Sequence, residues 1–146
     1  MKLEKIFEVK DGRLYRIGGG EVSTEGMAER VRWSDVEPES GVYDETFLAV
    51  LRDELKACEA QGTFAYIDAV FDRDGDAAQF TAAMKHCARR IKDCASVAGF
   101  SIPGRLADGG FGEGSVAATY MQELSQKHAH YVYFCKMPAP GVVLLH

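Results

Sequence analysis

The spacing of hydrophobic and polar residues along the chain predicts an alternation of strands and helices. Segments 5–10 and 13–17 alternate in polarity on either side of Asp11-Gly12, a dipeptide typical of hairpin turns. From residue 30 onward, short apolar runs alternate with longer segments whose apolar residues recur at helical spacing. Strands are expected at 30–36, 63–71, 97–102, 131–135 and 142–145, and helices at 45–60, 77–93 and 115–127.

Residues at the ends of these segments support the same interpretation. Asp44 is a residue type that caps helix N-termini, and Gly62 follows the first long helix. The nearly continuous apolar run 63–71 suits a strand buried on both faces, as in parallel sheets. The order β-α-β-α-β-α-β predicts the α/β class, with parallel strands joined by right-handed crossovers. We expect one domain over residues 1–146, in which a β-hairpin at 1–20 forms a cap and 28–136 form the α/β unit.

Composition and charge exclude several classes of protein. Hydrophobic residues make up 47% of the 146 residues and charged residues 27%, close to the values of globular domains. The formal net charge is −5 and no basic block is present, which argues against nucleic acid as a partner. No apolar run reaches the roughly 18 residues that a membrane helix needs, so no membrane partner is expected. The first residues lead into no signal peptide, and we therefore expect a cytoplasmic protein.

No group in the sequence is spaced to hold a metal or a cofactor. The cysteines have no metal-ligand spacing, and we expect reduced thiols packed as small core residues. The acidic loop 72–76 lacks the glycine and glutamate that a calcium-binding EF-hand needs at fixed positions. The three glycines 18–20 lack the Lys-Ser/Thr of a phosphate loop and predict a turn. The sequence therefore predicts no metal site and no cofactor.

One stretch of the chain is more specific than the rest. Residues 32–44, with the sequence RWSDVEPESGVYD, resemble the early strand-loop-helix unit of barrel glycoside hydrolases. The likeness is to the clan of retaining enzymes that includes cellulases and β-galactosidases. Residues 62–71 are similar to that family's strand ending in Asp-x-His-His, and 97–105 to the strand that carries its Asn-Glu-Pro. The resemblance covers about residues 28–136.

This resemblance implies a TIM barrel, but the length of the chain fits only part of one. A complete eight-stranded barrel takes about 250 residues, and about 200 is near the minimum. With 13–17 as the first strand and 24–30 as a shortened helix after it, about five of the eight strands are present. We therefore expect a parallel-strand partial (half-type) TIM barrel with an N-terminal β-hairpin. Its open sheet edges need cover, from the hairpin and residues 142–145, from a second copy in a homodimer, or by flattening into an open α/β sandwich.

The resemblance also implies a ligand site at the carboxyl ends of the strands, where barrel enzymes bind their substrates. In that site Trp33 would stack on a sugar, and Arg32 would bind hydroxyl groups or orient a carboxylate. The alternative is that Trp33 is core packing and Arg32 pairs with a local acid. The candidate ligand-binding residues near these ends are Arg32, Trp33, Glu37, Asp68, Asp72 and Arg105.

Departures from the family pattern concern its catalytic residues. Retaining hydrolysis needs two carboxyl groups about 5 Å apart, one as acid/base and one as nucleophile. Gly104-Arg105 stands where the family has Asn-Glu, and Val70-Phe71 replaces its two histidines, although Asp68 matches its aspartate. The late strand that carries the nucleophile is not among the 146 residues. No catalytic residue is therefore assigned, and Glu37 and Asp68 remain candidates.

Three functions remain open at this stage. The first is a non-hydrolytic relative of barrel glycosidases that binds a carbohydrate, another small molecule or nothing. The second is an active glycosidase-type hydrolase whose carboxylates have moved within the barrel. The third is an oligomerising or interaction protein without a ligand. The acids available to the second are Glu37, Asp68, Asp72, Asp108 and Glu113.

Overall fold

The computed structural model describes residues 3–146 of the chain. Residues 1 and 2, which begin the predicted domain and the predicted hairpin cap, lie outside the described residues. The strands are β1 (Phe7–Lys10), β2 (Arg13–Arg16), β3 (Ala28–Arg32), β4 (Ala65–Val70), β5 (Val97–Ser101), β6 (Val132–Cys135) and β7 (Val142–Leu144). The helices are α1 (Trp33–Val36), α2 (Glu45–Gln61), α3 (Ala77–Arg90), α4 (Gly104–Ala107) and α5 (Val116–Ser125).

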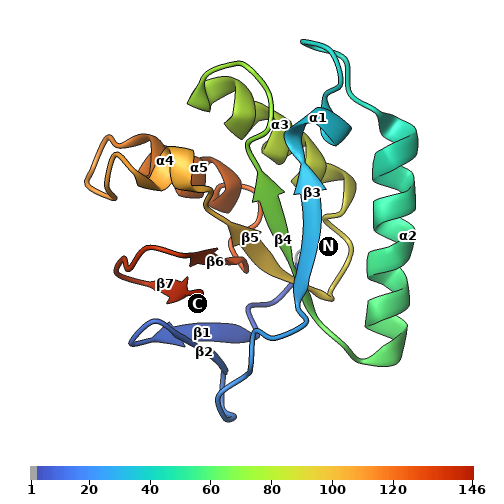
Figure 1. The fold of residues 1–146 in the computed structure, drawn as a ribbon. Coiled ribbons are helices and arrows are strands. Elements are labelled where there is room, and N and C mark those ends of the chain that lie inside the picture. The colour runs from blue at the N-terminus through green and yellow to red at the C-terminus, as the bar shows by residue number, and fades with distance from the viewer. Residues whose placement is uncertain (1–2) are drawn as a thin grey trace.

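A parallel sheet in the order β3-β4-β5-β6-β7 forms the centre of the structure (Figure 1). The antiparallel hairpin β1-β2 is a separate two-stranded sheet. Helices α2, α3 and α5 follow β3, β4 and β5 in the chain, as crossover helices between parallel strands do. The predicted α/β class is confirmed, and the chain forms a partial TIM barrel preceded by a β-hairpin.

The long helices begin and end at recognisable local signals. The Asp44 carboxylate accepts a hydrogen bond from the Phe47 N–H at 3.0 Å, and Gly62 ends α2 in the left-handed conformation with φ of 74°. Asp76 and Gln79 form a capping box at the start of α3. The predicted cap and stop of the first long helix are therefore confirmed, whereas α3 and α5 end a few residues earlier than the pattern predicts.

The two faces of the sheet belong to two different cores. The helices cover one face, where Ile67 and Phe100 are fully buried in the larger core. The opposite face would line the interior of a closed barrel, and we call it the inner face. The hairpin packs on it, with Phe7 and Leu14 buried against the inner-face side chains. The main inner-face residues of this smaller core are Tyr66, Ala98, Val132, Phe134 and Val143.

The predicted strand 30–36 is wrong in its second half. β3 ends at Arg32, and Trp33–Val36 forms the one-turn helix α1. The carboxylate of Asp72, just after β4, accepts hydrogen bonds from the Ser34 N–H at 2.9 Å and the Ser34 hydroxyl at 2.5 Å. A residue that follows the neighbouring strand β4 thus caps this turn, and the local alternation of polarity does not indicate it.

The prediction of which segments form the parallel strands is also wrong in part. Segment 13–17 is no barrel strand, because β2 belongs to the separate hairpin sheet with β1, and its one further bridge joins Tyr15 to Glu21 just after it in the chain. Residues 24–30 form no helix, since the chain turns before Ala28 and enters β3 there. The fifth parallel strand is instead β7, which pairs with β6 after the short connection 136–141. Residues 3–146 contain five parallel strands, as expected, but the first of them is β3 and not segment 13–17.

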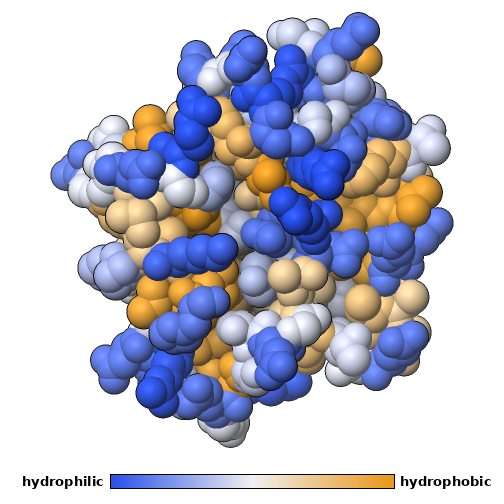
Figure 2. Space-filling model, in the orientation of Figure 1, coloured by the Kyte–Doolittle hydropathy of each residue, from blue (hydrophilic) through white to orange (hydrophobic). Residues whose placement is uncertain are grey.

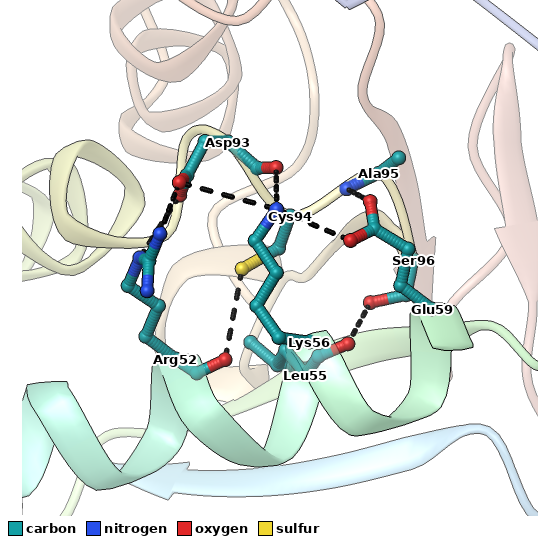
Figure 3. Close-up of polar contacts among 8 residues, drawn as sticks. All are labelled: Arg52, Leu55, Lys56, Glu59, Asp93, Cys94, Ala95 and Ser96. Atoms are coloured by element: carbon teal, nitrogen blue, oxygen red, sulfur yellow. Dashed lines mark hydrogen bonds and ion pairs between the residues drawn. The ribbon is translucent and has the colours of Figure 1, made fainter. Parts of the chain in front are cut away.

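A polar cluster ties α2 to the segment that leads into β5 (Figure 3). The Arg52 guanidinium forms an ion pair with Asp93, and the Ser96 hydroxyl donates to the Leu55 carbonyl at 2.7 Å. We call this group the α2–β5 cluster, and its residues are Arg52, Leu55, Lys56, Glu59, Asp93, Ala95 and Ser96. These contacts set where β5 begins relative to α2.

The surface seen in Figure 2 is mostly hydrophilic, with hydrophobic patches over α2 and beside β6 and β7. The exposed large hydrophobic residues, among them Val50 on α2, are scattered along the chain. Within residues 3–146, no helix combines the length and the apolar character needed to cross a membrane.

Candidate ligand site at the carboxyl ends of the strands

Asp68 lies on the inner face of the sheet, toward the carboxyl end of β4. Tyr66, two residues earlier, faces the hairpin core, and side chains two apart in a strand share a face. The hairpin therefore covers the amino half of β4, while Asp68 beyond it is half-buried. Across the sheet, Asp68 is paired in register with Arg30 of the edge strand β3, whose side chain is exposed.

Ser101, at the end of β5, is the residue that contacts Asp68. Its hydroxyl lies 3.3 Å from Asp68 Oδ1 as donor, and it accepts a hydrogen bond from the Ala69 N–H at 2.9 Å. The Ser101 carbonyl accepts from the buried Tyr120 hydroxyl at 2.9 Å. Burial, with a smaller effect from the Asp68 charge, raises the pKa of Tyr66. Ser101 was not among the predicted site residues, although a polar residue that closes an apolar strand is a signal for such a role.

Arg32 and Arg105 bring positive charge to the same end of the sheet. Arg32 is the last residue of β3 and is exposed. Arg105 lies in α4, directly after β5, with its guanidinium 4.5 Å from the ring centroid of Phe71. Phe71 follows β4, so this stacking joins the ends of two neighbouring strands. A stacked guanidinium keeps its N–H donors available at its edges, where a ligand can reach them.

Trp33 is placed in the core and not at a ligand surface. Its side chain is 1% exposed, with the rings of Phe71 and Phe80 at 4.9 and 5.6 Å between centroids. The Arg73 guanidinium lies 5.1 Å from the indole ring. Of the two interpretations offered by the sequence, core packing is the one that agrees with this burial, and no ring face is open to a sugar.

Glu37 holds the loop that follows α1. It is 7% exposed, and its two carboxylate oxygens accept hydrogen bonds from Trp33 Nε1 at 2.8 Å and from the Gly41 N–H at 2.7 Å. The Arg73 guanidinium lies 3.8 Å from the same carboxylate and donates to the Glu37 carbonyl. Tyr43, at the end of this loop, has a pKa raised by burial and by the Glu37 charge. Both oxygens of Glu37 thus have partners within the protein.

The other acids near the strand ends have different surroundings. Both oxygens of Asp72 accept hydrogen bonds from Ser34, as described above. Asp108 and Glu113 are exposed in the loop between α4 and α5. Asp68 is therefore the predicted candidate acid that lies on the inner face beside a polar partner. Of the six predicted ligand-binding residues, Arg32, Asp68 and Arg105 have polar atoms to offer a ligand, whereas Trp33, Glu37 and Asp72 support the fold around them.

The positions of the His, Cys, Asp and Glu side chains favour neither a metal site nor a reactive thiol. Among residues 3–146, no group of three or more His, Cys, Asp or Glu side chains could hold a metal ion. The cysteines are free thiols, and burial raises the pKa of Cys87 to about 12. Such a thiol stays protonated and unreactive at neutral pH.

Comparison with solved structures finds the same fold in barrel glycoside hydrolases. The catalytic domain of mannanase from Streptomyces sp. SirexAA-E matches 97% of this chain at 12% identity, with a TM-score of 0.58, and the match covers 54% of that protein. A GH5_18 from Bifidobacterium longum subsp. infantis matches 74% of this chain at 13% identity and a TM-score of 0.53, over 33% of its own length. Endo-glycoceramidase II from Rhodococcus sp., in a complex with a cellobiose-like imidazole, matches 73% of this chain at 15% identity and a TM-score of 0.53. That match covers 39% of the length of the endo-glycoceramidase.

These neighbours confirm the resemblance to barrel glycoside hydrolases at the level of the fold. The chain spans between a third and about half of the length of each of them. No protein-family model and no curated protein matches the sequence.

Proposed function

We propose that this chain is a glycoside-hydrolase-like partial barrel that binds a carbohydrate or a similar polar small molecule without hydrolysing it. The ligand would sit at the carboxyl ends of β3, β4 and β5, which are neighbours in the sheet. Arg32 and Arg105 would donate to ligand hydroxyl groups, and Asp68 would accept from them. Ser101 would hold the Asp68 carboxylate in place, as its 3.3 Å contact suggests.

The engagement of the candidate acids carries the non-hydrolytic part of this proposal. Retaining hydrolysis needs two carboxyl groups about 5 Å apart and free to act on the substrate. Glu37 and Asp72 have both oxygens hydrogen-bonded to protein groups, so neither is free to pair with Asp68. The other two candidates, Asp108 and Glu113, are exposed in the loop between α4 and α5 and not at the end of a strand. A single carboxylate at an end of the sheet that also carries Arg32 and Arg105 is suited to binding hydroxyl groups more than to paired acid and nucleophile chemistry.

Titration of the 15N-labelled protein with mannobiose and cellobiose, followed by NMR, tests the binding site. The names of the structural neighbours suggest these two sugars. We expect saturable shifts of the amide signals of Arg32, Asp68, Ser101 and Arg105. The variant Asp68→Asn should weaken binding about tenfold, because a charged acceptor is lost while its shape is kept. Asp53→Asn, at an exposed position on α2, is the matched control and should bind as the native chain does. No shift at about 10 mM of either sugar, or shifts confined to other residues, would remove the proposal.

Assays with chromogenic aryl glycosides separate binding from catalysis. We expect no release of the chromophore above the buffer rate. Release that is lost in Asp68→Asn and retained in Asp53→Asn would instead establish the alternative, an active hydrolase with relocated carboxylates.

The interaction-protein alternative rests on the open edge of the sheet. β3 pairs with β4 on one side only, and its exposed backbone edge could pair with a second copy. Light scattering over a range of concentrations decides this: a mass of one chain throughout would rule out closure of the sheet by a homodimer, and a mass of two chains would support it.

A further inference from the structure

A cavity lies at the end of the molecule opposite to the proposed carbohydrate site. It is bounded by the C-terminal part of α3, the end of α5 and residues 128–130, which lead into β6. Since all five strands of the sheet run parallel, the start of β6 marks the amino end of the sheet. The cavity volume of about 490 Å³ is in the range that holds a small organic molecule.

The cavity is lined by four cations and a single carboxylate, in a chain whose net charge is −5. Lys85, Arg89 and Lys92 recur along one side of α3 and its continuation, and Lys127 follows α5. Lys85 pairs with Glu123 at 3.3 Å, and the other three cations form no ion pair within residues 3–146. Cations at helix C-termini are favoured by the helix dipole. In this protein the cations near the C-terminal ends of two helices, α3 and α5, line the same cavity.

Two imidazoles complete the wall of this cavity. His128 is 7% exposed, and the ring of Tyr131 lies 5.2 Å from it and 4.5 Å from that of His130. The Nε2 atom of His130 is buried and has no hydrogen-bond partner within residues 3–146. Burial, with smaller effects from the neighbouring His130, Lys92 and Arg89, lowers the pKa of His128 to about 4. Burial also lowers the pKa of His130, so both imidazoles are neutral at pH 7 and each supplies an N–H donor as well as an acceptor.

We infer that this cavity binds a phosphate group, either as the free ion or on an organic phosphomonoester. The forked guanidinium of Arg89 and the ammonium groups of Lys92 and Lys127 are the donors that proteins use for such dianions. A ligand would also supply the negative charge that these cations lack. A second cavity of about 420 Å³, with Ile6, Phe7 and Val97 in its walls, shares Leu3 and His130 with the first and could receive the organic part.

Calorimetric titration with inorganic phosphate and with phenyl phosphate, at constant ionic strength, tests the inference. We expect one saturable site and a Kd raised about tenfold in the double variant Arg89→Ala/Lys92→Ala. Lys136→Ala, at an exposed position after β6, is the matched control and should bind as the native chain does. Tighter binding of phenyl phosphate would identify the ligand as an organic monoester, and equal or weaker binding would identify the free ion.

NMR of the native chain provides a second measurement that needs no variant. Phosphate should shift the amide signals of Ala129 and His130 and leave those of Arg32 and Asp68 unchanged, which separates this site from the proposed carbohydrate site. The inference is overturned if neither anion binds at about 10 mM, or if Lys136→Ala weakens binding as much as the double variant does.

Discussion

At the scale of the residue, Glu37 joins three parts of the chain through one side chain. It accepts hydrogen bonds from Trp33 and Gly41, and Arg73 lies 3.8 Å away. We expect Glu37→Gln to lower the free energy of unfolding by about 1–3 kcal/mol, because the amide keeps one acceptor and turns its NH₂ group toward a donor. Urea denaturation measures the change. Glu39→Gln, an exposed neighbour, is the control, and equal midpoints for the two variants would contradict the expectation.

His128 should make the stability of the protein depend on pH. Its pKa is about 4 in the folded chain, against an ordinary value of 6.5. Between these values the unfolded chain binds a proton that the folded chain does not, so the free energy of unfolding falls as the pH is lowered from 6.5 toward 4. We expect a contribution on the order of 1–2 kcal/mol, since the imidazole borders a cavity and is not fully shielded from water.

The variant His128→Gln isolates this effect from that of the carboxylates. Its free energy of unfolding, measured in urea at pH 7 and at pH 5, should decrease less than that of the native chain over the same interval. The same decrease in both proteins would show that His128 does not titrate as expected.

Individual candidate residues were predictable where position along a strand decides their place. Asp68 was expected near the carboxyl end of a strand and lies on the inner face there, and Arg105 follows the next strand. The burial of Trp33 could not be deduced, because it depends on Phe71 and Phe80, which come from later elements. The sequence pattern gives the neighbours along the chain but not those across the sheet.

At the scale of the element, the contacts of the α2–β5 cluster contribute unequally to the free energy of unfolding. The Ser96 hydroxyl is buried, and its bond to the Leu55 carbonyl at 2.7 Å is shielded from water. We expect Ser96→Ala to lower the free energy of unfolding by about 1–2 kcal/mol, because the buried Leu55 carbonyl keeps its partner within the helix but loses the hydrogen bond from Ser96. Arg52→Ala should have a smaller effect, since its pair with Asp93 is exposed and solvent screens it.

Thermal unfolding of the two variants measures this order directly. Ser96→Ala should have the lower midpoint, and the midpoint of Arg52→Ala should differ less from the native value in high salt than in low salt. A lower midpoint for Arg52→Ala would mean that the exposed ion pair, and not the buried hydrogen bond, joins α2 to β5.

Most elements were predictable from the chain itself, and the exceptions have a common cause. α2 begins at Asp44 and ends at Gly62 because its cap and its stop are local. α1 was predicted as strand because its cap, Asp72, comes from the loop after β4, far along the chain. Similarly, the alternation on either side of Asp11-Gly12 predicts the hairpin correctly, whereas counting 13–17 among the barrel strands was wrong, because local alternation does not show which sheet a strand joins.

At the scale of the whole molecule, the hairpin replaces solvent on the inner face of the sheet. Leu14 is 1% exposed within the smaller core. We expect Leu14→Ala to lower the free energy of unfolding by about 2–5 kcal/mol, the range for large-to-small changes in cores. Ile17→Ala, at a position 52% exposed just after β2, is the control and should change it by less than about 0.5 kcal/mol. Similar urea midpoints for the two variants would mean that the hairpin contributes little to the fold.

The grouping of charge is also a property of the whole molecule. The sequence shows no basic block, and on that ground a phosphate backbone was not expected as a partner. The cations of the proposed phosphate cavity come from α3, from its continuation at Lys92 and from Lys127 shortly after α5, and only the fold brings them to one place. A net charge of −5 therefore says nothing about the sign of charge within a single cavity.

The parallel pairing of the strands has a consequence for the order in which the chain folds. Ala28 is paired with Tyr66, and Tyr66 with Gly99, so a whole helix lies between partners along the chain. In the hairpin, by contrast, Lys10 is paired with Arg13. Forming a distant pair requires a long loop to close before any contact stabilises it, which slows folding. The hairpin should thus form early, and it would be ready to shield the inner face as soon as β3, β4 and β5 come together.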